Sequence, residues 1–257
     1  MRKTIIAGNW KMYKTIKEAI ELANGLKRGL FKLDFAKVDV VLCPAFTALS
    51  EVAEILNESE IGLGAQDIYW QEEGAFTGEV SPAMLKDAGC QYVIIGHSER
   101  RQFFGETNET VNKKIKAALK AGLTPIVCVG ENLKERESNN TFKVIEDHVK
   151  NSLVDISNED MLKIVVAYEP VWAIGTGKTA TPEQAQEVHA YIRGLLKSIY
   201  GLEVSSSVRI QYGGSVKPEN ITELMNKPDV DGALVGGASL KVESFSAIVT
   251  KASEVKK

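Results

Sequence analysis

Eight short apolar segments alternate with stretches of helical periodicity along this chain, and this alternation limits the fold more than any other feature. Apolar segments of this length, rich in Val and Ile, are typical of parallel strands buried on both faces. Strands that alternate with amphipathic helices predict a parallel sheet with its helices outside. The eight segments are residues 4–8, 38–43, 61–66, 92–96, 125–131, 164–167, 208–212 and 230–235.

The stretches between these segments contain helix start and stop signals. Thr15 and Glu18 have the spacing of a capping box, and Thr181 and Gln184 repeat it further along the chain. Gly122 follows an apolar helical pattern and predicts the end of that helix. These signals place helices directly between the expected strands.

Two arrangements of eight parallel strands are open to this chain, a doubly wound sheet and a closed barrel. The barrel matches the number of strands better, and the length of 257 residues is near the ~250 typical of one barrel. No linker or low-complexity tract divides the series. We therefore expect an α/β fold, a closed eight-stranded parallel (β/α)8 TIM barrel, in a single domain over residues 1–257.

Composition excludes several classes of protein. The net charge of -3 argues against a nucleic-acid surface, and no apolar run approaches the ~18 residues of a membrane span. The three cysteines, Cys43, Cys90 and Cys128, lie in or beside apolar segments without metal-type pairing. We expect a cytoplasmic protein with reduced cysteines, and no nucleic-acid or membrane partner.

The sixth apolar segment ends in a carboxylate that is followed by a glycine-containing apolar loop. Pro170 directly after Glu169 forces the chain to turn, and Trp172 and Ile174 would gain little in a solvated loop. This pattern favours a catalytic base beneath a lid that excludes water, although a solvated Glu169 stays open. Residues 177–179 resemble the end of a phosphate-binding P-loop, but that motif needs a glycine where Trp172 stands.

Glycine pairs follow the last two expected strands, at residues 213–214 and 236–237, with Ser215 and Ser239 close behind. Barrels often bind phosphate at these two loops, because glycine lets backbone N–H groups approach an anion. Tight turns are the alternative explanation for such pairs. No GxGxxG motif follows a strand, which argues against a dinucleotide cofactor.

Further polar residues fall where the carboxyl ends of the strands should gather, namely Asn9, Lys11 and His97. His97 could donate a hydrogen bond as a neutral imidazole or be a satisfied buried histidine, and Lys11 could be an ordinary surface lysine. No second ligand stands at metal spacing, so we expect no metal. The other histidines, His148 and His189, are expected to be solvated on helices.

A carboxylate, an imidazole, an ammonium group and a phosphate cradle together suit one type of reaction. Glu169 would remove a proton beside the carbonyl of a small phosphorylated sugar, and Lys11, His97 and Asn9 would stabilise the enediolate. A lid would protect this intermediate, which can expel phosphate when exposed to water.

The segment 67–81 is long for a loop and contains the aromatic residues Tyr69, Trp70 and Phe76. Long loops in compact domains are usually functional, and aromatic residues are enriched in interface cores. We expect a protein interface here; a loop folded back on its own domain is the alternative.

Six motifs of the chain resemble the triosephosphate isomerase family, and the resemblance extends over essentially the whole sequence. They are residues 9–12 (NWKM), 74–79 (GAFTGE), 96–101 (GHSERR), 167–177 (AYEPVWAIGTG), 212–216 (YGGSV) and 231–240 (DGALVGGASL).

The resemblance implies interconversion of dihydroxyacetone phosphate and D-glyceraldehyde 3-phosphate without a cofactor, in glycolysis and gluconeogenesis. It implies Glu169 as the base, His97 as the electrophile and Glu99 as a supporting carboxylate. Lys11 and Asn9 would contact the substrate. Backbone at Gly175, Ser215, Gly236 and Gly237 would hold the phosphate.

It also implies a homodimer in which the loop around Thr77 enters the partner beside Asn9 and Lys11, with Tyr13 bordering the contact. A noncatalytic phosphosugar-binding barrel and another phosphate-binding barrel enzyme, such as a ribulose-phosphate epimerase, are the alternatives. The assembled set of polar residues and the resemblance argue against both.

Overall fold

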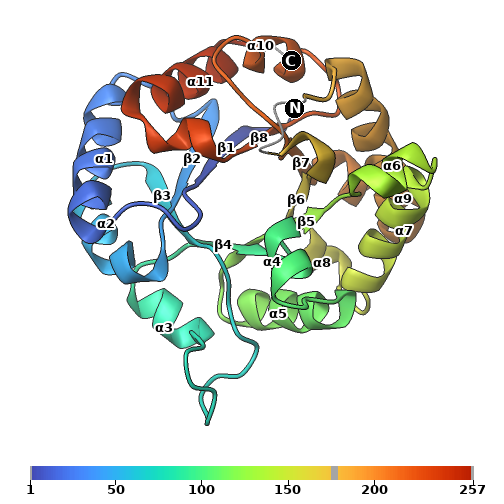
Figure 1. Ribbon diagram of the computed structural model, residues 1–257, viewed down its shortest axis with the longest axis horizontal. Helices are drawn as coiled ribbons and strands as arrows, with labels where there is room; N and C mark the ends of the chain where they lie inside the picture. Colours follow the sequence, from blue (N-terminus) through green and yellow to red (C-terminus); the bar gives the residue numbers. More distant parts are fainter. Residues whose placement is uncertain (1, 175–178, 256–257) are drawn as a thin grey trace.

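The computed structural model describes residues 2–174 and 179–255, and its strands close into a parallel barrel in sequence order. Helices surround the barrel as an outer ring (Figure 1). The predicted closed (β/α)8 barrel is therefore confirmed over the doubly wound sheet. The strands are β1 (Thr4–Asn9), β2 (Val38–Cys43), β3 (Ile61–Ala65), β4 (Tyr92–Ile95), β5 (Thr124–Val129), β6 (Val165–Tyr168), β7 (Arg209–Tyr212) and β8 (Gly232–Val235).

The helical ring contains all of the helices that periodicity predicts, and the capping signals lie at their ends. Glu18 accepts the Thr15 N–H at 2.8 Å, and Gln184 accepts the Thr181 N–H at 2.9 Å. These predicted helices are α1 (Ile16–Gly29), α2 (Leu49–Leu56), α5 (Asn108–Lys120), α7 (Thr141–Ser152), α9 (Pro182–Ser207, with a break at Gly201), α10 (Ile221–Met225) and α11 (Val242–Glu254).

Several further short helices in the connections had no counterpart in the sequence prediction. They are α3 (Pro82–Asp87), α4 (Ser98–Phe103), α6 (Leu133–Glu137), α8 (Asn158–Met161) and the 3-10 turns η1 (Phe46–Ala48), η2 (Val171–Ala173) and η3 (Gly237–Leu240). Four of them, η1, α4, η2 and η3, stand directly after strands and shape the carboxyl end of the barrel.

Closure depends on the pairing of β1 with β8, in which Ile5 lies opposite Gly232. A Cβ atom at Gly232 would lie 1.8 Å from the Ile5 carbonyl oxygen, so only glycine allows this approach. Two buried apolar layers follow from the closure, one inside the barrel and a larger one between the strands and the helices. The predicted place of the cysteines in the core is confirmed, since Cys43, Cys90 and Cys128 are all free and buried.

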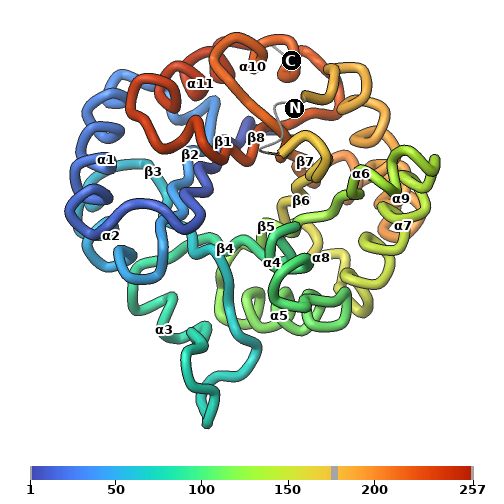
Figure 2. Tube along the Cα trace, in the orientation of Figure 1, coloured from blue at the N-terminus to red at the C-terminus, as the bar shows by residue number. Residues whose placement is uncertain are grey.

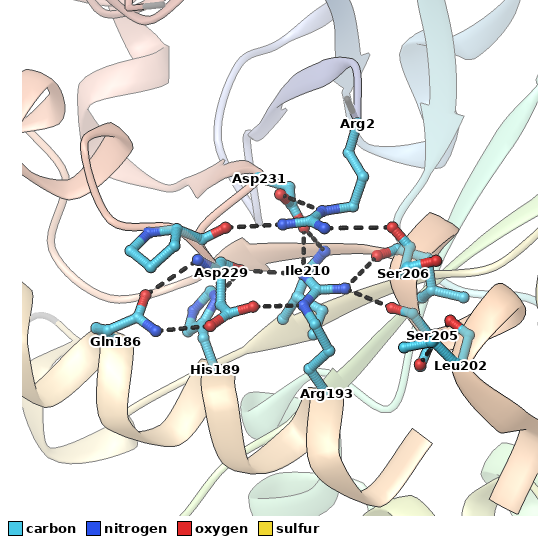
Figure 3. Close-up of polar contacts among 12 residues, drawn as sticks. Arg2, Gln186, His189, Arg193, Leu202, Ser205, Ser206, Ile210, Asp229 and Asp231 are labelled. Atoms are coloured by element: carbon cyan, nitrogen blue, oxygen red, sulfur yellow. Dashed lines mark hydrogen bonds and ion pairs between the residues drawn. The ribbon is translucent and has the colours of Figure 1, made fainter. Parts of the chain in front are cut away.

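A buried polar network lies at the amino ends of the last strands, and we call it the amino-end cluster (Figure 3). Arg193 of α9 contacts Asp229 at 2.6 Å and Asp231 at 2.7 Å, and its remaining N–H groups donate to main-chain oxygens of residues 205 and 208. Asp231 also accepts from Arg2 at 2.7 Å, and Asp229 accepts from Gln186 at 2.7 Å. Each cation therefore faces an anion within the cluster.

The connection between β3 and α3 projects away from the ring (Figures 1 and 2). Its aromatic rings pack on one another, with Tyr69 stacked on Trp70 at 4.1 Å and next to Phe76 at 4.7 Å between ring centroids. Lys113 of α5 lies over the Trp70 ring, so the base of the loop rests on its own barrel, while Phe76 stays 40% exposed.

Among the described residues, no helix is long and apolar enough to cross a membrane.

Candidate active site

The carboxyl ends of the strands open onto a cavity of about 590 Å³ that collects most of the predicted site residues. Glu99 lies beside this group, in contact with Lys11. Gly175 lies outside the described residues. Predicted residues that line the cavity are Asn9, Lys11, His97, Glu169, Ser215, Gly236 and Gly237.

Glu169 is the most deeply buried acid of this group, with 2% of its surface exposed directly after β6. Its Oε1 lies 2.9 Å from His97 Nε2, and its Oε2 accepts the Ser98 N–H at 2.9 Å. Burial raises the pKa of the carboxyl, but the imidazole and the Ser98 N–H outweigh burial, so the pKa of Glu169 is lowered. The carboxylate is thus kept in the basic form that proton abstraction needs.

His97 forms the N-cap of α4, and this fixes the tautomer of its ring. Nδ1 accepts the Glu99 N–H at 3.2 Å, so the proton of a neutral ring resides on Nε2 and points to Glu169. Burial lowers the pKa of His97, but the adjacent Glu169 carboxylate raises it by more. A neutral donor therefore requires that Glu169 move away from the ring.

Lys11 has a backbone φ of +52°, a left-handed conformation that residues other than glycine rarely adopt. Two hydrogen bonds hold the Lys11 backbone in this conformation. Asn9 Oδ1 accepts the Lys11 N–H at 3.0 Å, and Gln66 Nε2 donates to the Lys11 carbonyl at 2.8 Å. As a result the ammonium group lies 2.6 Å from Glu99 Oε1, at the edge of the cavity. We call Asn9, Lys11, His97, Glu99 and Glu169 the carboxyl-end cluster.

The glycine pair after β8 lies where an anion could meet backbone N–H groups. Gly237 begins η3, and a Cβ atom placed on it would meet no atom within 4 Å, so the approach to its backbone is open. A Cβ on Gly236 would lie 3.5 Å from Lys11 Cε, which places the lysine stem beside the pair. Backbone donors and an ammonium group are therefore available on one wall of the cavity.

The first part of the expected lid, residues 171–174, is tied to the end of β5 through Glu131. Glu131 Oε1 accepts Trp172 Nε1–H at 2.9 Å and the Tyr168 hydroxyl at 3.1 Å. Burial raises the pKa of Glu131. The rest of the expected lid includes residues outside the described part of the chain.

A second cavity, of about 600 Å³, is also lined by Glu169. Its walls come from α4, α6, α7 and the start of the lid, and they include Ser98, Arg101, His148 and Trp172. Glu169 thus lines both cavities.

Sequence reasoning missed three contributors to the site: Gln66, Ser98 and Glu131. Gln66 and Glu131 each end an apolar segment, and this is the signal that identified Asn9, so both were detectable. Ser98 acts through its main-chain N–H as well as its hydroxyl, and a main-chain donor has no sequence signature.

The expected exposure of the other two histidines is wrong. His189 is fully buried because its ring fills the space between Tyr168 and Tyr212, and burial lowers its pKa to about 4. His148 is half-buried, and its Nδ1 accepts the Gly130 N–H. Within residues 2–174 and 179–255, no group of three or more His, Cys, Asp or Glu side chains is arranged to hold a metal ion.

Comparison with known proteins assigns this site to a family. The family model described as triosephosphate isomerase matches residues 4–252. The chain belongs to the triosephosphate isomerase family. It is 60% identical over 249 residues to the triosephosphate isomerase of Trichlorobacter lovleyi, which covers 97% of this chain and 98% of the relative.

Other members of the triosephosphate isomerase family agree over the same length. The protein of Carboxydothermus hydrogenoformans is 60% identical over 253 residues, and that of Clostridium botulinum is 59% identical over 249. Both alignments cover 97% of this chain and at least 98% of the relative. The matched region includes every residue of the carboxyl-end cluster.

Proposed function

We propose that this protein interconverts dihydroxyacetone phosphate and D-glyceraldehyde 3-phosphate, the reaction for which its family is named, as a step of glycolysis and gluconeogenesis. One observation carries the proposal beyond family membership. Glu169, His97 and Lys11 line a single cavity together with the glycine pair after β8. A base, two donors and an anion site are the groups that an enediolate reaction needs.

Glu169 is the base that moves a proton between two adjacent carbons of the substrate, the one that carries the carbonyl oxygen and the one that carries the hydroxyl. Nε2–H of His97 and the ammonium group of Lys11 donate to the oxygen on which charge develops. Each such donor is worth about 2.7–4 kcal/mol in the transition state. Asn9 contributes a polar side chain to the same wall, and it also holds the Lys11 backbone at 3.0 Å.

Substrate binding rearranges the contact between the base and the electrophile. Nε2–H of His97 points at Glu169, so the carboxylate must leave the ring before this N–H can meet a substrate carbonyl. That movement also removes the charge that raises the pKa of His97, so the imidazole donates in its neutral form. Glu99 remains as the partner of Lys11 and orients its ammonium group.

The substrate phosphate binds to backbone N–H groups at Ser215, Gly236 and Gly237, with Gly175 of the lid as a further donor. Two observations support this position for the phosphate: the space beside the Gly237 backbone is open, and the Lys11 side chain lies next to Gly236. Closure of residues 171–176 over the phosphate excludes water from the enediolate.

A coupled assay that starts from D-glyceraldehyde 3-phosphate tests the function directly. We expect the wild-type protein to turn over, and Glu169→Gln to lower kcat by about 10³-fold or more because the base is lost. Glu159→Gln, an exposed acid on α8, is the matched control and should retain wild-type activity. An inactive wild type would refute the function, and an active Glu169→Gln would refute the assigned base.

The homodimer is part of the proposal, with the loop around Thr77 as its contact. Phe76 and Thr77 are exposed on this projecting loop. A cavity of about 500 Å³ beside Met12, Tyr13 and Thr47 is open to receive the same loop of a second copy. Met12 and Tyr13 are 95% and 58% exposed, which suits a surface that a partner covers.

Sedimentation at micromolar concentration tests the dimer. We expect a dimer for the wild type and a monomer for Phe76→Arg, because the charge would be placed in the contact. Phe31→Arg, at a 74% exposed site after α1, is the control and should stay dimeric. A monomeric wild type contradicts the proposed contact.

Cytoplasmic location belongs to the same proposal, supported by three free, buried thiols that suit a reducing compartment.

A further inference from the structure

The backbone that carries Glu169 rests on the end of β5 without any side chain between them. A Cβ atom at Gly130 would lie 1.8 Å from the Glu169 carbonyl oxygen and 2.7 Å from its carbonyl carbon. On either side of this contact, the Glu169 N–H donates to Val129 at 2.8 Å and the Val171 N–H donates to Glu131 at 3.0 Å. Residues 129–131 therefore form the bed on which residues 169–171 lie.

His148 of α7 holds this bed from outside the barrel. Its Nδ1 accepts the Gly130 N–H at 3.3 Å, just beyond the last residue of β5. The ring is half-buried and lines the second cavity together with Ser98 and Glu169. One hydrogen bond thus joins the outer helix to the glycine that touches the base.

The hydrogen bond requires a neutral imidazole, because a protonated Nδ1 has no lone pair to offer. Burial, with help from the Arg101 guanidinium of α4, lowers the pKa of His148 to about 4. Asp147 on the same helix and Glu169 act in the opposite direction but do not outweigh burial. The acceptor is therefore present throughout the neutral pH range.

We propose that His148 is a positioning residue for Glu169, acting through Gly130, in the isomerase reaction proposed above. If the Gly130 N–H loses its acceptor, the residue can turn out of its present orientation, and the Glu169 backbone must follow because the two are in direct contact. The reacting carboxylate then shifts relative to His97 and the substrate carbon. A misplacement of ~1 Å can cost a rate as much as 100-fold.

The expected size of the effect is smaller, because water in the second cavity can partly replace the lost acceptor. For His148→Leu we expect kcat to fall about tenfold, with KM within about twofold of wild type, since the phosphate site is untouched. His148→Asn carries an acceptor oxygen close to the position of Nδ1 and should restore most of the lost kcat.

The measurement is kcat and KM per folded site for wild type, His148→Leu and His148→Asn, with thermal unfolding of each recorded alongside. Lys150→Leu, an exposed position on the same helix, is the matched control and should match the wild type. His148→Ala is the second variant if the leucine protein does not fold, and the same fall in kcat is expected of it.

A His148→Leu protein that unfolds more easily but keeps the wild-type kcat would overturn the inference, because His148 would then be only structural. Failure of His148→Asn to recover kcat would overturn it as well. An inactive wild type refutes the proposed function instead, so the two failures are distinguishable.

Discussion

The two ends of the barrel both bury charged groups, but they treat them differently. In the amino-end cluster, Arg193 and Arg2 are directed at Asp229 and Asp231, and spare N–H groups donate to main-chain oxygens (Figure 3). In the carboxyl-end cluster, Lys11 and His97 line an open cavity beside their acidic partners. In the first arrangement the cations are paired with internal anions, whereas in the second they face a cavity that a ligand can enter.

The difference teaches that burial of charge alone does not identify a functional site. A saturated cluster fixes where strands and helices meet, and breaking it leaves an uncompensated buried charge. A cluster whose donors face a cavity can exchange its internal partners for those of a substrate. Barrels commonly divide stability and chemistry between their two ends in this way.

The largest effect that would test this division is expected from Arg193→Ala. Removing the guanidinium takes one ion-pair partner from the buried Asp231 and one from the partly buried Asp229, so the free energy of unfolding should fall by about 3 kcal/mol. Urea unfolding measures the loss, and Arg28→Ala on the exposed face of α1 is the control. Turnover per folded molecule should be unchanged; a fall in kcat would show that the two ends are not separate.

The converse prediction concerns Lys11→Met at the other end. Loss of the ammonium donor should lower kcat/KM by roughly 10²–10³-fold. The free energy of unfolding should stay within ~0.5 kcal/mol of wild type, because the contact to the half-exposed Glu99 adds little to stability. A stable but fully active variant would remove Lys11 from the chemistry.

A third prediction concerns His189, which links the ends: its Nδ1 contacts the Asp229 carbonyl at 3.1 Å, and its ring packs on Tyr168, next to Glu169. Burial lowers its pKa from 6.5 to about 4, so between these two pH values His189 is protonated in the unfolded chain but neutral in the folded chain. The stability is fully present above about pH 6.5 and is lost as the pH falls towards 4, by roughly 3 kcal/mol.

Unfolding in urea at several pH values between 4 and 7 measures this slope. His189→Gln should flatten it by about one proton. His148 has a similarly lowered pKa and contributes a second proton in the same window, so part of the slope should remain in the variant. An unchanged slope would mean that His189 is protonated in the folded protein.

Periodicity predicted the barrel because each strand and each long helix carries its own apolar pattern. The short helices escaped prediction because α4 and η2 are too brief to repeat. The carboxyl-end residues were predictable since Asn9, His97 and Glu169 stand where apolar segments stop. What could not be predicted is the role of contacts between distant segments, such as Gln66 with the Lys11 carbonyl.

The histidines show the same limit. His148 and His189 lie on amphipathic helices, and their polar side chains predicted solvent exposure. Their actual surroundings are set by which helix face meets which strand, as with His189 between Tyr168 and Tyr212. A local pattern cannot supply that information, because a histidine suits both a wet and a dry environment.

The closing ladder between β1 and β8 has a consequence for biosynthesis. Ile5 leaves the ribosome 227 residues (232 − 5) before its partner Gly232. At ordinary elongation rates this is a delay on the order of ten seconds or more. Throughout that interval one edge of the first strand lacks its native partner, so the barrel cannot close until the eighth strand has been synthesised.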